Sequence, residues 1–306
     1  MSSSTPQDQL DFRNARTRHF LRAAWGLISG RPTQLTPWDE VRDKLKLRGM
    51  IYRGVQTVPL DKIVGSVGRY RDFDDRFLPT QNSTGDRWRK VNRAYYDDVN
   101  LPPIKLYKVG EVYFVLDGNH RVSVAREHGS TYIDAEVEEA MTRVPVTEQD
   151  IDGDTLEMLG EYQDFLERTR LDKLRPEQHI RMSVAGGYKR LLEHIAVHGY
   201  YMGLEHKRDI TEDEAVIDWF DNVYMPIIQS VREHEILKDF PKRTESDLYL
   251  WVIDHQHYLR EHVRQEGCGD CDVDADEATT DYADKYSQKP VVRRVVDAFG
   301  EFIESL

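Results

Sequence analysis

The sequence predicts an α+β protein in which a mixed α/β domain is followed by an all-helical domain. Between residues 57 and 137, short apolar or alternating segments separated by turn residues are typical of β-strands. From about residue 155 on, apolar residues recur three and four positions apart, which is typical of amphipathic helices. We therefore expect a helical lead-in over 1–48, the α/β domain over 49–145 and the helical domain over 146–306.

Two helices are expected before the first strand. Apolar residues at helical spacing predict a helix over 8–29, stopped by Gly30 and Pro32. A shorter helix over 38–47 is expected to begin near Thr36 or Pro37. A short strand from Thr57 then enters a turn or a short helix. The remaining elements of the α/β domain are, in order, a loop-rich segment over 65–100 with a helix over 88–96, strands over 104–109 and 112–116 joined at Gly110, a helix from Val122 to His128 closed by Gly129, and a strand over 131–137.

Five helices are expected in the second domain, over 155–170, 176–202, 212–238, 245–265 and 289–305. Thr211 with Glu214, and Thr244 with Asp247, have the spacing of N-terminal capping boxes. Eight acidic residues and no basic one fall within 266–284, for which we expect a flexible acidic loop.

The charges are divided unevenly between the two halves of the chain. The net charge is −13, but residues 1–150 hold 23 basic and 21 acidic side chains, whereas residues 151–306 hold 19 and 34. Residues 1–100 alone hold 18 basic and 12 acidic side chains. Overall acidity disfavours indiscriminate coating of DNA, but it does not exclude a local anion site in the first half.

Composition excludes several classes of protein. The chain holds 16 Tyr, 10 Phe and 5 Trp, too many for a fully disordered protein, and no apolar run approaches the length of a transmembrane helix. Two Cys exclude a disulfide scaffold and fit a reducing compartment. The first residues lack a signal-peptide pattern. We expect a cytoplasmic protein without a membrane partner.

The motif with the most chemical content is Asp117-Gly-Asn-His-Arg121, between a predicted strand and a predicted helix. A glycine after a buried strand permits a tight turn, and the N–H groups that follow lie at a helix N-terminus, where an anion is stabilised. His120 and Arg121 add side-chain donors, and arginine binds phosphate bidentately. The alternative is a structural turn in which Arg121 pairs with Asp117 or Glu127.

Three segments in order resemble the ParB/sulfiredoxin superfamily, over about residues 52–140. Val58-Pro-Leu-Asp-Lys-Ile-Val64 resembles the first strand and turn of ParB amino-terminal domains, and Leu101-Pro-Pro-Ile-Lys-Leu-Tyr-Lys-Val109 resembles the second strand. Residues 113–129 resemble the signature strand and helix. The resemblance implies a ParB/sulfiredoxin-like α/β domain that binds a nucleotide or phosphate at the turn. Asn119 stands where sulfiredoxins have their Cys nucleophile, which disfavours repair of an oxidised cysteine.

The expected function is a phosphotransferase or nucleotide hydrolase that uses a nucleoside phosphate (ATP, ADP or CTP) with Mg²⁺, or that binds another phosphorylated small molecule. Asp117 and His120 are the candidate catalytic residues. Asp117 would hold a metal or take a proton, and His120 would donate a hydrogen bond or move a proton. The candidate phosphate-binding residues are Gly118, Asn119, His120, Arg121, Arg69 and Arg71. One alternative is a DNA-associated ParB-like regulator or nuclease that contacts DNA through residues 69–93. Another is a non-catalytic protein-interaction module.

Four further patterns have two interpretations each. Arg69-Tyr-Arg71 is either a second phosphate clamp or a loop neutralised by nearby aspartates. Residues 87–93 surround Trp88 with basic side chains, which suits either single-stranded nucleic acid or an amphipathic helix with a buried Trp88. Histidines 194, 198, 255 and 257 with aspartate 254 are either metal ligands or hydrogen-bonded core residues. Residues 268–271 form one Cys-x-x-Cys, interpreted as two incidental or mildly redox-active thiols.

Overall fold

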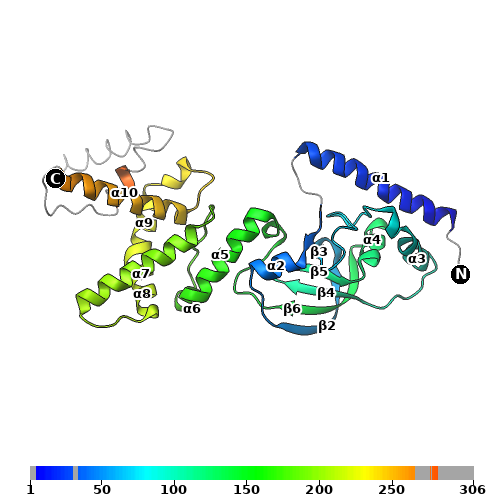
Figure 1. The fold of residues 1–306 in the computed structure, drawn as a ribbon, viewed down its shortest axis with the longest axis horizontal. Helices are drawn as coiled ribbons and strands as arrows, with labels where there is room; N and C mark the ends of the chain where they lie inside the picture. The colour runs from blue at the N-terminus through cyan, green and yellow to red at the C-terminus, as the bar shows by residue number, and fades with distance from the viewer. Residues whose placement is uncertain (1–4, 30–33, 266–275, 277, 282–306) are drawn as a thin grey trace. The chain divides into compact units, whose positions relative to one another are not determined.

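A six-stranded mixed sheet forms the centre of the first part of the chain (Figure 1). The computed structural model describes residues 5–29, 34–265, 276 and 278–281. The strand order is β1-β3-β5-β4-β6-β2. The strands are β1 (Thr36–Pro37), β2 (Met50–Pro59), β3 (Ile63–Ser66), β4 (Ile104–Val109), β5 (Val112–Asp117) and β6 (Tyr132–Ala140). Together with the helices, this sheet confirms the predicted α+β class.

The two central strands form the hairpin that the sequence predicts. β4 and β5 pair antiparallel, with Val109 opposite Val112, and β5 continues in parallel pairing to β3. On the other side, β4 pairs parallel with β6, and β6 pairs antiparallel with β2. β5 therefore lies inside the sheet, and its carboxyl end carries the Asp117–Arg121 motif.

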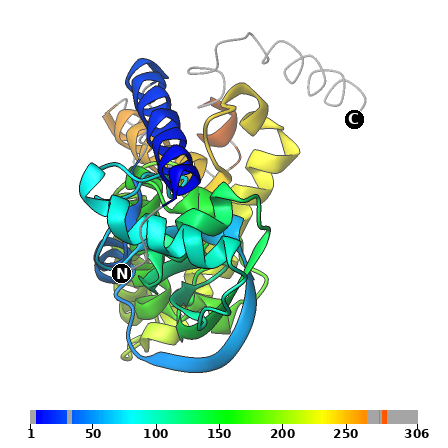
Figure 2. The same ribbon diagram turned by 90° about the vertical axis from the view of Figure 1, so that its right-hand side faces the viewer.

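Helices pack on both faces of the sheet. Successive strand residues face opposite sides, so Phe114 and Val115 mark the two faces. On the first face, Trp38 of α2 (Trp38–Lys44) lies 5.1 Å from the ring of Tyr107 and 5.2 Å from that of Phe114. On the second face, Val115 shares one hydrophobic core with side chains of the helices α1 (Pro6–Ser29), α3 (Gly85–Tyr96) and α4 (Asn119–Glu127). Figure 2 shows α1 beside α3.

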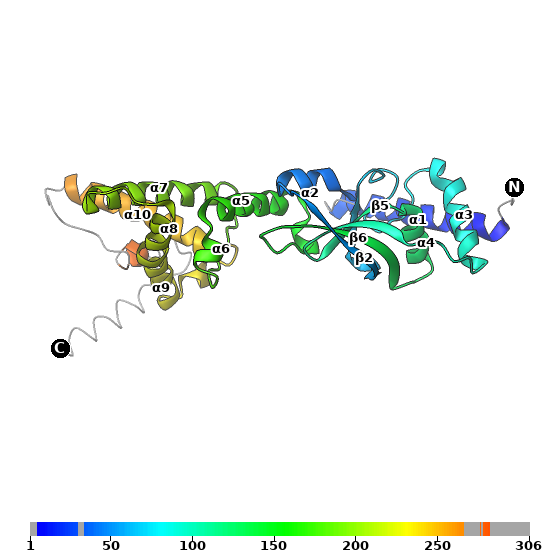
Figure 3. The ribbon, with the colours of Figure 1, turned by 90° about the horizontal axis from the view of Figure 1, so that it is seen from below.

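The chain divides into two compact units, Met1–Gly160 and Glu161–Leu306, and the division falls within α5 (Gly153–Thr169). Short 3₁₀ helices in the first unit are η1 (Leu60–Lys62), η2 (Asn82–Thr84) and η3 (Glu148–Asp150). The second unit is helical (Figure 3). Its elements after α5 are α6 (Leu171–Leu174), α7 (Gly187–His206), α8 (Glu212–Trp219), the π-helical turn η4 (Phe220–Tyr224), α9 (Met225–Glu233), η5 (Ile236–Asp239) and α10 (Glu245–Gln265).

Several predicted boundaries in the first unit were wrong. The first long strand begins at Met50 rather than Thr57, because β2 pairs with β6 as far as Ala140 although most of its side chains are exposed. The helix expected from Val122 begins at Asn119. The segment 65–100 is predicted to be surface loop and short helix. A helix does cover Gly85–Tyr96, but the preceding part is not all surface, because Phe73 and Phe77 are 1% and 0% exposed.

In the second unit, the helix expected over 176–202 begins only at Gly187. The backbone N–H of Ser183 donates to Asp247, and that of Met182 donates to the Tyr188 hydroxyl, so tertiary partners replace helical ones. The helix expected over 212–238 is interrupted by η4 and ends in η5. Both predicted capping boxes are present. The helix expected over 289–305 and most of the acidic stretch 266–284 lie outside the described residues.

Candidate functional site

The candidate turn begins where β5 ends and α4 starts. Gly118 adopts φ 115° and ψ 16°, a backbone conformation that L side chains rarely adopt. A Cβ at this position would lie 2.4 Å from Cγ2 of Ile104, so the turn is also too crowded for a side chain. Gly118 is the N-cap residue of α4, and no side chain caps that end. The first N–H groups of α4 therefore have no side-chain acceptor, and they lie at the positive end of a helix.

Arg121 is held by the turn and by the segment that precedes β4. Its Nη2 donates to Asp117 at 2.8 Å, and its Nη1 donates to the carbonyl of Pro103 at 3.2 Å and to that of Pro102. The Arg121 side chain is 16% exposed, whereas the Asp117 side chain is 58% exposed. The ion pair between Arg121 and Asp117, which the structural-turn alternative predicts, is thus present. The Asp117 carboxylate nevertheless faces solvent. Glu127 pairs instead with Arg18.

His120 is buried and lies against Arg69. Arg69 Nη1 is 3.1 Å from His120 Nε2, and Arg69 Nε donates to Asp72 at 2.7 Å. Burial, and then the charges of Arg69 and Arg87, lower the pKa of His120 to about 4. The imidazole is therefore neutral at pH 7. Because a guanidinium only donates hydrogen bonds, Nε2 is the acceptor and the proton is assigned to Nδ1.

Two buried polar atoms at the turn lack a hydrogen-bond partner within the described part of the chain. They are Nδ1 of His120 and Oδ1 of Asn119. These two residues are 4% and 5% exposed. The His120 ring packs edge-on against Phe73, with 5.2 Å between the centroids. Buried polar groups are nearly always paired, so two neighbouring exceptions at a helix N-terminus are typical of a site that takes a ligand or water.

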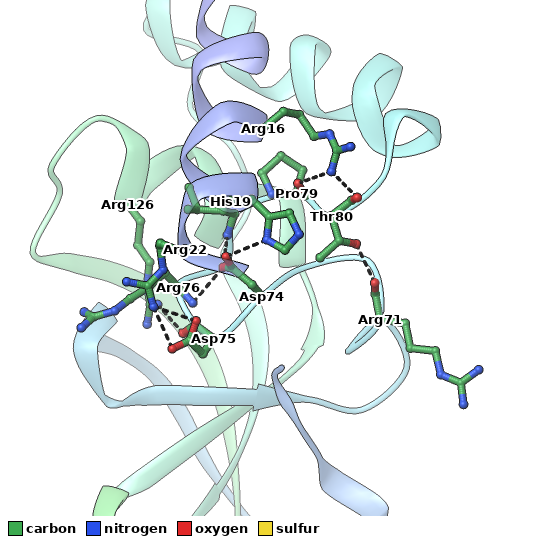
Figure 4. Close-up of polar contacts among 11 residues, drawn as sticks. Arg16, His19, Arg22, Arg71, Asp74, Asp75, Arg76, Pro79, Thr80 and Arg126 are labelled. Carbon is green, nitrogen blue, oxygen red and sulfur yellow. Dashed lines mark hydrogen bonds and ion pairs between the residues drawn. The ribbon is translucent and has the colours of Figure 1, made fainter. Parts of the chain in front are cut away.

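The structure brings some of the predicted site residues into contact, and among the described residues it shows no contact between them and Arg71. Asp117 contacts Arg121, and Arg69 contacts His120. Gly118 and Asn119 lie between Asp117 and His120 in the sequence. Arg71 is exposed, and its guanidinium lies 5.6 Å from the centre of the Tyr70 ring. Figure 4 shows the Arg71 side chain pointing away from the contacts around Asp74 and Asp75.

The segment 87–93 forms most of α3, as the amphipathic-helix alternative predicts. Trp88 is 0% exposed, and its Nε1 donates to Ser123 Oγ at 2.9 Å. A buried Trp88 presents no face on which a base could stack. Arg89 and Arg93 form ion pairs with Asp86 and Asp97.

Three of the candidate histidines, 194, 198 and 255, are hydrogen bonded to neighbouring side chains. His194 Nδ1 lies 3.2 Å from the Tyr249 hydroxyl, and His198 Nε2 lies 2.7 Å from Asp218. Burial lowers the pKa of His194. Among the described residues, no group of three or more His, Cys, Asp or Glu is placed to hold a metal ion. Cys268 and Cys271 lie outside the described residues.

One polar cluster had no counterpart in the sequence analysis (Figure 4). Asp74 is 1% exposed, and it accepts hydrogen bonds from the N–H groups of Arg76 and Leu78 and contacts His19 Nδ1 at 2.9 Å. The next residue, Asp75, accepts two bonds of 3.0 Å from Arg22. Segments more than 50 positions apart meet here, and no local sequence pattern signals such a contact.

Comparison with known proteins adds little to this geometry. No protein-family model matches the chain, and no curated protein matches it. Among solved structures, the chain is similar to a Pnob8-like ParB-N domain in its C2221 form, with 12% sequence identity and a TM-score of 0.20, over 84% of this chain and 98% of that chain. A TM-score of 0.20 is too low to assign a function from this likeness. Among the described residues, no helix is long and apolar enough to cross a membrane.

Proposed function

We propose that the Asp117–Arg121 turn binds the phosphate of a nucleotide or of another phosphorylated small molecule. The observation that carries this proposal is the buried N–H of His120 Nδ1, which has no partner among the described residues and lies at the uncapped N-terminus of α4. Backbone N–H groups at such an end bind anions, and Arg69 and Arg121 add positive charge beside it.

The chemistry that fits these residues is stabilisation of negative charge on a phosphoryl group. Phosphoryl transfer depends mainly on positioning and on electrostatic stabilisation, which backbone amides and arginines supply. With a pKa of about 4, His120 is neutral at pH 7 and fits a hydrogen-bond donor better than a general acid. Mg²⁺ is usually held by one or two carboxylates together with phosphate oxygens, and the exposed Asp117 fits the role of that carboxylate.

Thermal unfolding of the full chain with ATP, ADP or CTP, each with Mg²⁺, tests the proposal. A ligand at 100 times its Kd adds about 2.7 kcal/mol to the free energy of unfolding, so binding raises the melting temperature. We expect the shift with at least one nucleotide and its loss in Arg69→Ala and Arg121→Ala. Arg13→Ala, which removes an exposed arginine of α1, is the matched control. No shift with any nucleotide would contradict nucleotide binding, and a shift unchanged in both variants would contradict the assignment of the site to this turn.

Three further measurements test the predictions about Arg71, about hydrolysis and about DNA binding. Arg71→Ala tests the predicted phosphate contact of Arg71, whose guanidinium lies against the Tyr70 ring. Release of inorganic phosphate from a bound nucleotide distinguishes hydrolysis from binding alone. A DNA duplex at low salt belongs in the same panel, because Arg87 and Lys90 on α3 are exposed and form no salt bridge within the described part of the chain.

A further inference from the structure

A cavity of about 970 Å³ lies in the first unit, at a place separate from the candidate turn. Its walls come from the second half of α1, residues 34–36, the segment around η1, the loop 75–78, the carboxyl-terminal half of α4, residues 130–131 just before β6, and the segment 148–152. α4 contributes Ser123, Arg126 and Glu127, whereas none of residues 117–121 lines the cavity. The volume is in the range of pockets that bind small molecules.

Four arginines line this cavity, and two of them are neutralised by neighbouring carboxylates. Arg18 forms an ion pair with Glu127, and Arg22 forms its two hydrogen bonds of 3.0 Å with Asp75. Arg126 and Arg76 form no salt bridge with any carboxylate in the part of the chain that the structure describes. Figure 4 shows Arg22, Arg76 and Arg126 around Asp75.

The guanidinium of Arg126 is held in place by carbonyl groups. Its Nη2 donates to Ile63 at 2.9 Å and to Leu60, and its Nη1 donates to the backbone carbonyl of Asp75 at 3.3 Å. It also lies 4.9 Å from the centre of the Phe77 ring. Burial, and then the charge of Arg76, lower the pKa of Arg126 to about 10, so the group stays charged at neutral pH. The negative charges of Asp75, Asp61 and Asp74 partly offset this lowering, but none of these carboxylates forms a salt bridge with Arg126.

Arg76 stands on a loop that a buried carboxylate makes rigid. Asp74 accepts hydrogen bonds of 3.0 and 2.8 Å from the N–H groups of Arg76 and Leu78. The guanidinium of Arg76 is exposed and has no hydrogen bond to a described residue. Nε of Arg22, next to it in the cluster, is buried and also lacks a partner there. The fixed loop thus presents Arg76, whose five side-chain donors have no acceptor among the described residues. Beside it lies Arg126, which forms no salt bridge with a described carboxylate.

We propose that this cavity binds a phosphate monoester of a small polyol or amino alcohol, with the phosphate on Arg76 and Arg126. A phosphate dianion matches two guanidinium groups that form no salt bridge with a described carboxylate, and arginines bind phosphate oxygens in pairs. Asp61 and Asp152 also line the cavity and form no salt bridge with a described residue. Carboxylates only accept hydrogen bonds, so they suit hydroxyl or ammonium groups on the rest of the ligand.

Calorimetric titration of the full chain with glucose 6-phosphate, inorganic phosphate and glucose tests this assignment. We expect glucose 6-phosphate to bind more tightly than inorganic phosphate, and glucose not to bind. Arg76→Ala should weaken binding about 10- to 100-fold, because it removes charge-assisted hydrogen bonds. The Arg76 side chain donates no hydrogen bond to any described residue, so this variant is expected to fold. Arg126→Lys keeps the charge but loses the forked donors, and it should also weaken binding. Arg13→Ala should not change it.

The site does not depend on the function proposed for the turn, and the variants separate the two. Arg121→Ala should leave glucose 6-phosphate binding unchanged, and Arg76→Ala should leave any nucleotide response unchanged. The assignment is overturned if neither phosphate compound binds, if affinity is the same in Arg76→Ala, or if Arg121→Ala abolishes binding of the sugar phosphate. An equal response to sodium chloride at matched ionic strength would also overturn it.

Discussion

Gly118 combines an unusual backbone conformation with a lack of space, and the two effects can be measured separately. A Cβ at Gly118 meets Ile104 at 2.4 Å, whereas a Cβ at Gly129, which also has positive φ, has no atom within 4 Å. Gly118→Ala should therefore lower the free energy of unfolding by about 2–4 kcal/mol, through both backbone strain and overpacking. Gly129→Ala should cost about 1 kcal/mol, through strain alone. Urea denaturation measures both, and equal losses would contradict the role of Ile104.

His120 should make the stability of the first unit depend on pH. Its pKa is about 4 in the folded protein against an ordinary value of 6.5, so below pH 6.5 the unfolded chain takes up a proton that the folded chain does not. Stability should fall by roughly 2–3 kcal/mol from this group as the pH decreases from about 7 to about 4, and level off below that.

The free energy of unfolding of the wild type and of His120→Gln, measured between pH 7 and pH 4, isolates this contribution. The variant should lose less stability over the range, whatever its stability at pH 7. His206→Gln, at an exposed position on α7, should follow the wild-type slope. Parallel curves for the wild type and His120→Gln would show that His120 titrates normally in the folded protein.

At the scale of elements, Tyr249 connects three helices of the second unit. Its hydroxyl accepts a 2.9 Å hydrogen bond from Trp219 Nε1 on α8 and lies 3.2 Å from His194 Nδ1 on α7. Tyr249→Phe leaves the buried Trp219 N–H without an acceptor, which should cost about 1–3 kcal/mol of unfolding free energy. Tyr201→Phe, on an exposed side chain of α7, should change it by less than about 0.5 kcal/mol. Chemical denaturation followed by Trp fluorescence measures both variants, and equal effects would contradict the connecting role of Tyr249.

Elements with a strong local signal were the ones that the sequence predicted well. The β4–β5 hairpin is marked by two apolar strands around Gly110, and α4 ends at Gly129 in a Schellman motif, with Ser130 N–H bonded to Ala125 and Gly129 N–H to Arg126. The capping box at Thr211 is equally local. In each case the residues that decide the structure are adjacent in sequence, so the pattern itself contains the information.

Elements decided by distant partners were missed. Phe73 and Phe77 lie in a segment rich in charged residues, and they are buried because α1 and α4 pack over that segment. The same holds for the candidate site. The motif at 117–121 is contiguous and was found, whereas Arg22, Asp75 and Arg126 meet only after folding. The sequence places Arg126 only within a short predicted helix, and no neighbouring residue indicates that its guanidinium is partly buried.

At the scale of the whole molecule, each of the two units buries large apolar side chains of its own. Trp88, Phe114 and Val115 are buried in the first unit, and Phe165, Trp219 and Tyr249 in the second. Two compact units predict two cooperative transitions, because a core substitution acts on the unit that contains it. A single hydrophobic core would instead melt in one transition.

Differential scanning calorimetry of the full chain checks this prediction with two substitutions already described. Gly118→Ala should lower the melting temperature of one transition and leave the other in place, and Tyr249→Phe should do the reverse. In the double variant the two losses of unfolding free energy should add to within about 0.5 kcal/mol, as expected for distant, independent sites. A single transition that both substitutions lower would show that the two units unfold together. In that case a ligand bound at the turn or in the arginine-lined cavity would stabilise the helical unit as well.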